Sequence, residues 1–227
     1  MNERPLPFAP QAVLLDMDGL MLDSERALLE CWQQASAEQQ VGIDDAFWLS
    51  MVGLHERECT RLLRERLGRE PADALRARCH VLHSARVDAG LDHRPGLQPL
   101  LELLVEQGMT RAVVTSTRRE RALQKLGAAG LLRHFDTVLT GSDIEHPKPA
   151  PDIYLLAASR LGVEPAGCLV LEDSVPGVRA ALAAGMTPVQ VPDLVAPDAQ
   201  ARALGHRVVA SLHEARELLQ QALALRA

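Results

Sequence analysis

The sequence predicts an α/β fold, with a parallel β-sheet covered by helices on both faces and a small all-helical domain inserted into it. Short apolar runs alternate with helix-period segments along most of the chain, a pattern typical of parallel sheets with crossover helices. One long stretch between the first and second apolar runs is helical throughout. Residues with polar, reactive side chains follow several of the apolar runs directly.

The sheet is predicted from short apolar runs, and its covering helices from apolar residues at helical spacing. The expected strands are residues 12–15, 111–115, 137–139, 168–171, 188–191 and 207–209. The expected helices between them are residues 97–106, 120–126, 152–161 and 178–184. Glycines mark where these helices should stop, at Gly108, Gly127, Gly162 and Gly185. An amphipathic segment from residue 211 onward predicts a last helix that packs on the core.

The inserted domain is predicted between the first and second strands, where no strand-like run occurs. Its expected helices are residues 25–38, 44–51, 56–67 and 72–89. The chain is therefore expected to divide into a core of residues 1–20 and 93–227 and a helical cap domain of residues 21–92.

Composition narrows the classes of partner. The chain has 227 residues, a net charge of −6 and only 3% aromatic residues, and no basic patch contains interleaved aromatics. These features argue against a nucleic-acid polymer as partner. No apolar run approaches the roughly 18 residues that a membrane span needs, and the N-terminus lacks the apolar region of a signal peptide. We therefore expect a cytoplasmic protein that does not enter a membrane, either a monomer or a weak dimer.

Reactive side chains are predicted to meet at one edge of the sheet. They follow the strand ends in "VLLDMDG", "AVVTSTR" and "LVLEDSV" and lie in the loop "HPKPAPD". The residues are Asp16 with Asp18, Thr115 with Ser116, Lys148, and Glu172 with Asp173. Ligands of parallel sheets bind beyond the carboxyl ends of the strands, where such residues converge. Only two lysines exist, Lys125 and Lys148, so a mechanism that needs a lysine has two candidates.

This set of side chains suits phosphoryl chemistry. Clustered carboxylates become tolerable around a divalent cation, and an oxygen-rich site with few ligands favours Mg²⁺. A hydroxyl and an ammonium can hold the phosphoryl oxygens, with help from backbone N–H groups. One carboxylate can attack phosphorus to form an acyl phosphate. A second, two residues on, can protonate the leaving oxygen and later deprotonate water.

The chain resembles the haloacid dehalogenase (HAD) superfamily, in the branch of helical-cap phosphatases and β-phosphoglucomutase-like enzymes. The resemblance spans residues 13 to about 191 and rests on "DMDGLMLDSE", the Thr/Ser strand end, "KPAPDIY" and "LEDSVPGVRAALAAGM", in this order. It implies a Rossmann-like parallel sheet core, known as the HAD fold, with an inserted helical cap. It also implies a small phosphorylated substrate and Mg²⁺ as cofactor.

The resemblance implies a role for each acidic residue. Asp16 would be the nucleophile that becomes phosphorylated, and it would also ligate Mg²⁺. Asp18 would be the general acid/base, with its main-chain carbonyl on the metal. Asp173 would ligate Mg²⁺ directly or through water, and Glu172 would do likewise.

The remaining implied roles concern the phosphate and the leaving group. Thr115 would hydrogen-bond the phosphoryl group with Ser116 beside it, in a register open by one residue. Lys148 would neutralise both the nucleophile and the phosphate. In the cap loop "WLSMVGLHERE", residues His55, Glu56 and Arg57 are candidates for recognising the substrate.

Residue inventory separates the reactions known for this superfamily. The second aspartate, Asp18, argues against haloacid dehalogenation, and a cap without lysine argues against phosphonoacetaldehyde hydrolysis. A sugar phosphate mutase of the β-phosphoglucomutase type is less supported, because the cap lysine is missing and Leu28 stands near the position of the cap histidine. A Mg²⁺-dependent phosphatase acting on a sugar or polyol phosphate through an aspartyl phosphate remains. The open alternatives are the mutase, a nucleotide or pseudouridine-type monophosphate phosphatase, and a binding protein without turnover.

Overall fold

A parallel sheet forms the centre of the core. The computed structural model describes residues 6, 8–52 and 56–224, and within them the six strands lie in the order β3-β2-β1-β4-β5-β6. The strands are β1 (Ala12–Leu15), β2 (Thr110–Val114), β3 (Thr137–Leu139), β4 (Cys168–Glu172), β5 (Thr187–Gln190) and β6 (Arg207–Val208). The predicted fold class is confirmed, and each predicted strand is present with its ends within one residue.

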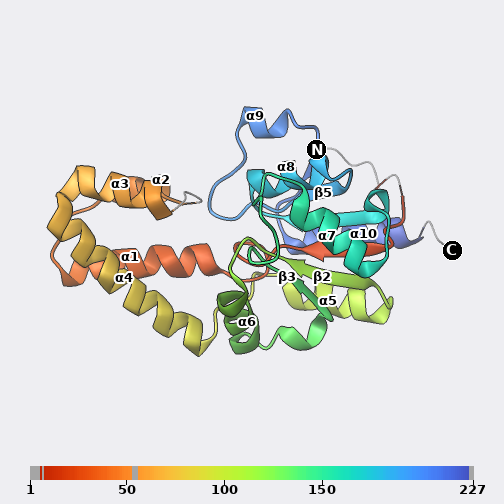
Figure 1. Ribbon diagram of the computed structural model, residues 1–227, viewed down its shortest axis with the longest axis horizontal. Coiled ribbons are helices and arrows are strands. Elements are labelled where there is room, and N and C mark those ends of the chain that lie inside the picture. The colour runs from red at the N-terminus through yellow and green to blue at the C-terminus, as the bar shows by residue number, and fades with distance from the viewer. Residues whose placement is uncertain (1–5, 7, 53–55, 225–227) are drawn as a thin grey trace.

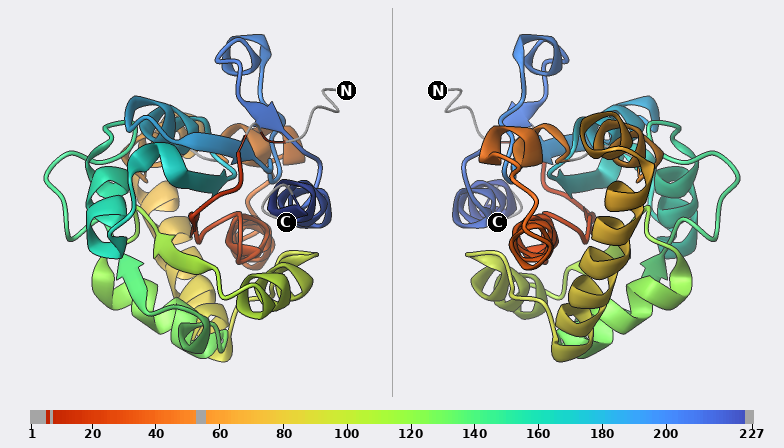
Figure 2. Two further views of the ribbon diagram at one scale, coloured as in Figure 1. Left: turned by 90° about the vertical axis from the view of Figure 1, so that its right-hand side faces the viewer. Right: turned by 90° about the vertical axis from the view of Figure 1, so that its left-hand side faces the viewer.

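Helices cover both faces of this sheet (Figure 2). They are α5 (Leu97–Glu106), α6 (Arg119–Ala128), α7 (Asp152–Leu161), α8 (Val175–Ala183), α9 (Ala199–Arg202) and α10 (Leu212–Leu223), with short turns η1 (Leu132–His134) and η2 (Pro165–Gly167). Along β1, Val13 and Leu15 pack with residues of α5 and α10, whereas Ala12 and Leu14 pack with α7 and α8. This alternation follows the two-residue period of a strand, and it buries β1 on both sides.

The predicted stop of one helix is wrong, and two helices begin three residues earlier than predicted: α8 begins at Val175, and the helix expected from residue 72 begins at Arg69. Helix α6 continues to Ala128, so Gly127 lies inside its last turn rather than after it. The glycine with a left-handed backbone that follows this helix is Gly130, with φ 68°. Two alanines follow Gly127, and alanine favours helix strongly enough for the helix to continue past one glycine. The short helix α9 was not predicted.

The helices between β1 and α5 project from one edge of the sheet (Figure 1). They are α1 (Ser24–Glu38), α2 (Asp45–Ser50), α3 (Glu56–Leu67) and α4 (Arg69–Ala89). Helix α4 packs against α1 and α3, and also against α6 of the core. These helices share a hydrophobic core of their own that includes Trp48, Leu63 and Leu75. We refer to α1–α4 as the cap.

The chain passes between core and cap at two adjacent points. Backbone N–H of Asp23 donates to the carbonyl of Asp92 at 2.9 Å, and the N–H of Arg94 donates to the carbonyl of Met21 at 2.9 Å. The division into domains at residues 20/21 and 92/93 stays a prediction. Among the described residues, no helix has both the length and the apolar character to cross a membrane.

Candidate active site

Asp16 stands at the carboxyl edge of the sheet, directly after the central strand. Its backbone N–H donates to the carbonyl of Leu171 in β4 at 3.0 Å. Its side chain is largely buried, and Oδ1 accepts a hydrogen bond from Lys148 Nζ at 2.6 Å. Burial raises the pKa of Asp16 to about 7, with repulsion from Glu172 adding to it and the Lys148 ammonium opposing it.

Lys148 reaches the same point from the loop before α7. Its side chain is only 4% exposed, and Nζ donates to Asp16, to Glu172 Oε1 at 2.5 Å and to the carbonyl of Val114 at 3.0 Å. Burial alone would lower the pKa of Lys148, but the charges of Asp16 and Glu172 raise it well above its usual value. The ammonium therefore stays charged between two carboxylates.

Glu172, the last residue of β4, is fully buried and surrounded by donors. Oε1 accepts from Lys148 and from the Tyr154 hydroxyl at 3.0 Å, and Oε2 accepts from the Ser174 N–H at 3.0 Å and its hydroxyl at 2.8 Å. A Cβ on Gly177 would collide with this carboxylate. The geometry favours Glu172 as an anchor for Lys148, and its predicted contact with a metal stays a prediction.

Asp173 is held beside the loop that follows β1. A Cβ on Gly19, which has φ 79°, would collide with Asp173 Oδ2, so only glycine allows this approach. The carbonyl of Asp173 accepts from Gln190 Nε2 at 2.9 Å. Burial raises the pKa of Asp173 well above its usual value, and the charges of Glu172 and Asp16 raise it further.

Asp18 is held by donors from two other segments. Oδ1 accepts from Lys125 Nζ on α6 at 2.5 Å, and Oδ2 accepts from the Thr117 hydroxyl at 2.7 Å. Burial would raise the pKa of Asp18, but the charge and hydrogen bond of Lys125, together with hydrogen bonds from Thr117 and Ser24, lower it. Asp18 is therefore a carboxylate at neutral pH in this arrangement.

The two predicted phosphate-binding hydroxyls differ in position. Thr115 is 1% exposed and follows β2, with its Oγ1 accepting from the Thr117 N–H at 3.1 Å. Ser116 is exposed. The Thr115 hydroxyl proton remains available for a second acceptor, since a hydroxyl both donates and accepts. Both phosphate-binding roles stay predictions.

Two of the three predicted specificity residues are described by the structure. His55 lies outside the described residues, Glu56 begins α3, and Arg57 is an exposed residue of its first turn. The structure places a different set of cap residues around a cavity.

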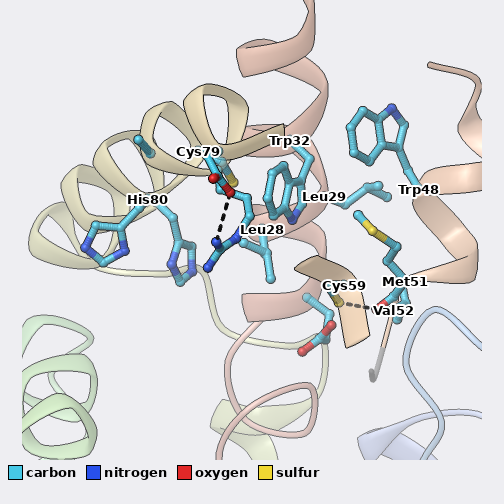
Figure 3. Close-up of a pocket in the computed structure, with 14 residues that line it drawn as sticks. Leu28, Leu29, Trp32, Trp48, Met51, Val52, Cys59, Cys79 and His80 are labelled. Atoms are coloured by element: carbon cyan, nitrogen blue, oxygen red, sulfur yellow. Dashed lines mark hydrogen bonds and ion pairs between the residues drawn. The ribbon is translucent and has the colours of Figure 1, made fainter. Parts of the chain in front are cut away.

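This cavity has a volume of about 670 Å³ and lies between the helix pairs α1/α4 and α2/α3 of the cap (Figure 3). Its apolar wall includes Leu28, Trp32, Trp48 and Met51. The rings of Trp32 and Trp48 stack with centroids 5.8 Å apart and planes inclined by 16°. A cavity of this size, apolar with a few polar groups, is typical of small-molecule sites.

Two polar residues of the cavity lining interact electrostatically with residues of the core. Glu25 and His83 contribute to the lining. The charge of Glu25 raises the pKa of Asp173, whereas burial, followed by the charges of Lys125 and Arg121, lowers the pKa of His83 to about 4. The cavity therefore lies within electrostatic range of the residues at the sheet edge.

The donor set fits a divalent cation. Asp16 and Glu172 share the ammonium of Lys148, and Asp173 interacts electrostatically with all three, so the carboxylates outnumber the ammonium. Among the described residues no group of three His, Cys, Asp or Glu side chains is arranged to hold a metal. Mg²⁺, however, keeps several waters and is bound in proteins by one or two carboxylates together with substrate phosphate. The carboxylates of Asp16 and Asp173, together with the main-chain carbonyl of Asp18, would therefore be a sufficient donor set.

Sequence reasoning missed Thr117 and Tyr154, and it gave Lys125 no role although lysine scarcity made it one of two candidates. Lys125 is buried on the same face of α6 as Ala122. Thr117 ends the run Thr115-Ser116-Thr117, so this continuous run of three hydroxyl residues could have indicated it. Nothing in the sequence distinguishes Tyr154 from a residue of the apolar core.

The chain is similar in sequence to a known family of hydrolases and to two phosphatases. Residues 13–191 match the profile described as haloacid dehalogenase-like hydrolase. The chain is 31% identical over 177 residues to a phosphorylated carbohydrates phosphatase of Thermotoga maritima, covering 78% of this chain and 82% of that protein. It is also 31% identical over 185 residues to the fructose-1-phosphate phosphatase YqaB of Escherichia coli, covering 79% of this chain and 95% of that protein.

A solved structure extends the similarity to the fold. A HAD family hydrolase from Deinococcus radiodurans, crystallised with bound phosphate and sodium, superposes with a TM-score of 0.80 at 31% sequence identity. The alignment covers 94% of this chain and 97% of that one.

Proposed function

The chain belongs to the haloacid dehalogenase-like hydrolase family, and on that premise we propose that it is a Mg²⁺-dependent phosphatase of small sugar or polyol phosphates that works through an aspartyl phosphate on Asp16. The observation that carries the proposal is the buried Asp16–Lys148 pair at 2.6 Å, with Asp18 two residues further along. Relatives named as carbohydrate phosphatases support the choice of substrate class.

In the first step, a carboxylate oxygen of Asp16 attacks the phosphorus atom and the bond to the leaving oxygen breaks. Lys148 and the Thr115 hydroxyl hold the phosphoryl oxygens and stabilise their charge. Asp18, when protonated, gives its proton to the leaving alkoxide, which departs as an alcohol.

In the second step, Asp18 is again a carboxylate and takes a proton from water. The resulting hydroxide attacks the phosphorus of the aspartyl phosphate, which releases inorganic phosphate and restores the carboxylate of Asp16. Because Lys125 and Thr117 lower the pKa of Asp18, its side chain is present as the carboxylate from which this step starts.

The residues that would hold Mg²⁺ are the side chains of Asp16 and Asp173 and the main-chain carbonyl of Asp18. When bound, the ion would neutralise the excess carboxylate charge and polarise the phosphoryl oxygens. Glu172 would act through Lys148, because both of its oxygens already accept hydrogen bonds.

The leaving group would occupy the cap cavity. A sugar ring carries an apolar face of C–H groups and an edge of hydroxyls. Trp32 offers the cavity an apolar surface, while Arg76 and His80 offer polar groups. This division of the wall suits a polar ring better than a purely aliphatic chain.

Activity is expected to require the metal. The wild-type protein should release inorganic phosphate from hexose and polyol phosphates with Mg²⁺ present, lose this activity in excess EDTA and regain it when Mg²⁺ is restored. A colorimetric phosphate assay over a substrate panel measures this result. Product analysis by chromatography separates hydrolysis from a mutase, which would yield an isomeric sugar phosphate. Undiminished phosphate release in EDTA would contradict the metal site.

Filling the cavity is expected to change substrate preference. Ala77 of α4 lines the cavity. Ala77→Phe should raise KM for a hexose 6-phosphate by about tenfold, since a few atoms in a binding pocket change affinity by about 1–2 kcal/mol. KM for the smaller glycerol phosphate should change by about twofold at most.

The matched control is Ala85→Phe, the same substitution at an exposed position two turns along the same helix. It should leave both KM values unchanged. Equal effects of Ala77→Phe on the large and the small substrate would show that the leaving group lies elsewhere.

A further inference from the structure

We propose that Lys125 is a positioning residue, which holds the carboxylate of Asp18 in the orientation that general acid–base catalysis requires. The inference rests on the proposed function, because it assigns Asp18 to proton transfer. It adds a residue of α6, outside the strand ends and loops that carry the other reactive groups.

The first support is the geometry around Asp18. Lys125 donates to Oδ1 at 2.5 Å and Thr117 donates to Oδ2 at 2.7 Å. One donor comes from α6 and the other from the loop after β2. With each oxygen bound to a different segment, the carboxylate cannot rotate without breaking one of the two hydrogen bonds.

The second support is the burial of Lys125 itself. The residue is 7% exposed, and it lies between the buried residues Ala122 and Leu126 of α6. A buried ammonium is costly unless it is paired, so an apolar residue would serve packing better at this position. Within the described residues, Nζ of Lys125 donates to the carboxylate of Asp18 and makes no other hydrogen bond or ion pair, so the buried charge serves Asp18.

The third support is that the two lysines are assigned to different carboxylates. Lys148 contacts Asp16 and Glu172, whereas Lys125 contacts Asp18. The sequence contains no other lysine. Each of the two proposed catalytic aspartates is thus held by its own buried ammonium.

The choice of substrate separates the acid role of Asp18 from its base role. With a sugar phosphate, formation of the aspartyl phosphate needs Asp18 to protonate the leaving oxygen. With p-nitrophenyl phosphate the leaving group departs as p-nitrophenolate, and this step needs no proton. Hydrolysis of the aspartyl phosphate needs Asp18 as a base with both substrates.

The experiment compares Lys125→Met with wild type on both substrates. We expect kcat for a hexose phosphate to fall by roughly 10- to 100-fold, with KM changed by about twofold at most, because a misplaced acid/base slows catalysis without weakening binding. With p-nitrophenyl phosphate, rapid-mixing experiments should show an intact first burst of p-nitrophenolate, followed by slow steady turnover. Arg119→Met, which removes an exposed charge from the same helix, should behave as wild type.

A double-mutant cycle decides whether Lys125 acts through Asp18. The measured quantity is the rate of phosphate release after the burst. If Lys125 positions Asp18, Lys125→Met should have no further effect in the Asp18→Asn background. The same fold-loss in both backgrounds would overturn the proposal, as would wild-type kinetics or a raised KM with unchanged kcat.

Stability is controlled separately. If Lys125→Met does not fold, Lys125→Gln replaces it in the cycle, because glutamine can still donate a hydrogen bond but carries no charge. Lys125→Arg, which retains the charge, should recover part of kcat. Turnover by Asp16→Asn would overturn the proposed function itself, whereas an inactive Asp16→Asn together with an unchanged Lys125 effect in the Asp18→Asn background would overturn only this inference.

Discussion

Asp16→Asn is expected to reduce phosphate release by roughly 10³-fold or more, the scale seen when an enzyme loses its nucleophile. The amide of asparagine is too weak a nucleophile to form the phosphoryl intermediate. Its carbonyl oxygen can still accept the hydrogen bond from Lys148, so the fold should survive. The measurement is phosphate release from a hexose phosphate with Mg²⁺, alongside thermal unfolding followed by circular dichroism.

Asp198→Asn is the matched control for this substitution. Asp198 is exposed and caps α9, far along the chain from the site. The same loss of charge there should leave turnover unchanged. Near wild-type activity in a folded Asp16→Asn protein would exclude Asp16 as the nucleophile.

Lys148→Met is expected to reduce both activity and stability. The substitution leaves the carboxylates of Asp16 and Glu172 buried without their shared ammonium. Removing one partner of a buried ion pair costs about 3–5 kcal/mol. The free energy of unfolding, measured by urea titration, should therefore decrease by about this amount, and phosphate release should fall to background.

A second substitution tests the cause of the stability loss. Glu172→Gln removes one of the two uncompensated charges, so the Lys148→Met/Glu172→Gln double variant should be more stable than Lys148→Met alone. It should remain inactive, because no ammonium holds the phosphoryl group. If the double variant is less stable than the single one, unpaired charge is not the origin of the effect.

The fold was predictable because local pattern and global architecture agree. Strands such as Ala12–Leu15 and Cys168–Glu172 are apolar on both faces, which indicates a sheet covered on both sides. Boundaries were less predictable. Gly127 should have ended α6 by local preference, yet the helix continues through it, since neighbouring alanines outweigh the cost of one glycine.

The site was predictable where strand topology determines position. Asp16, Thr115 and Glu172 lie at or just beyond the ends of adjacent parallel strands, and such ends must converge. Lys125 and Tyr154 reach the site from helices, where the direction of a side chain depends on how the helix docks. The cap cavity depends on the packing of four helices, which spacing along the chain does not define.

The tryptophan stack in the cap has a spectroscopic consequence. The chain contains two tryptophans, and both Trp32 and Trp48 belong to cap helices. Fluorescence excited at wavelengths that tyrosine does not absorb therefore originates in the cap alone, and the sheet contributes no emission. A fluorescence-detected melting curve reports the cap, and circular dichroism reports the whole chain. Any separation between the two curves measures how independently the cap melts.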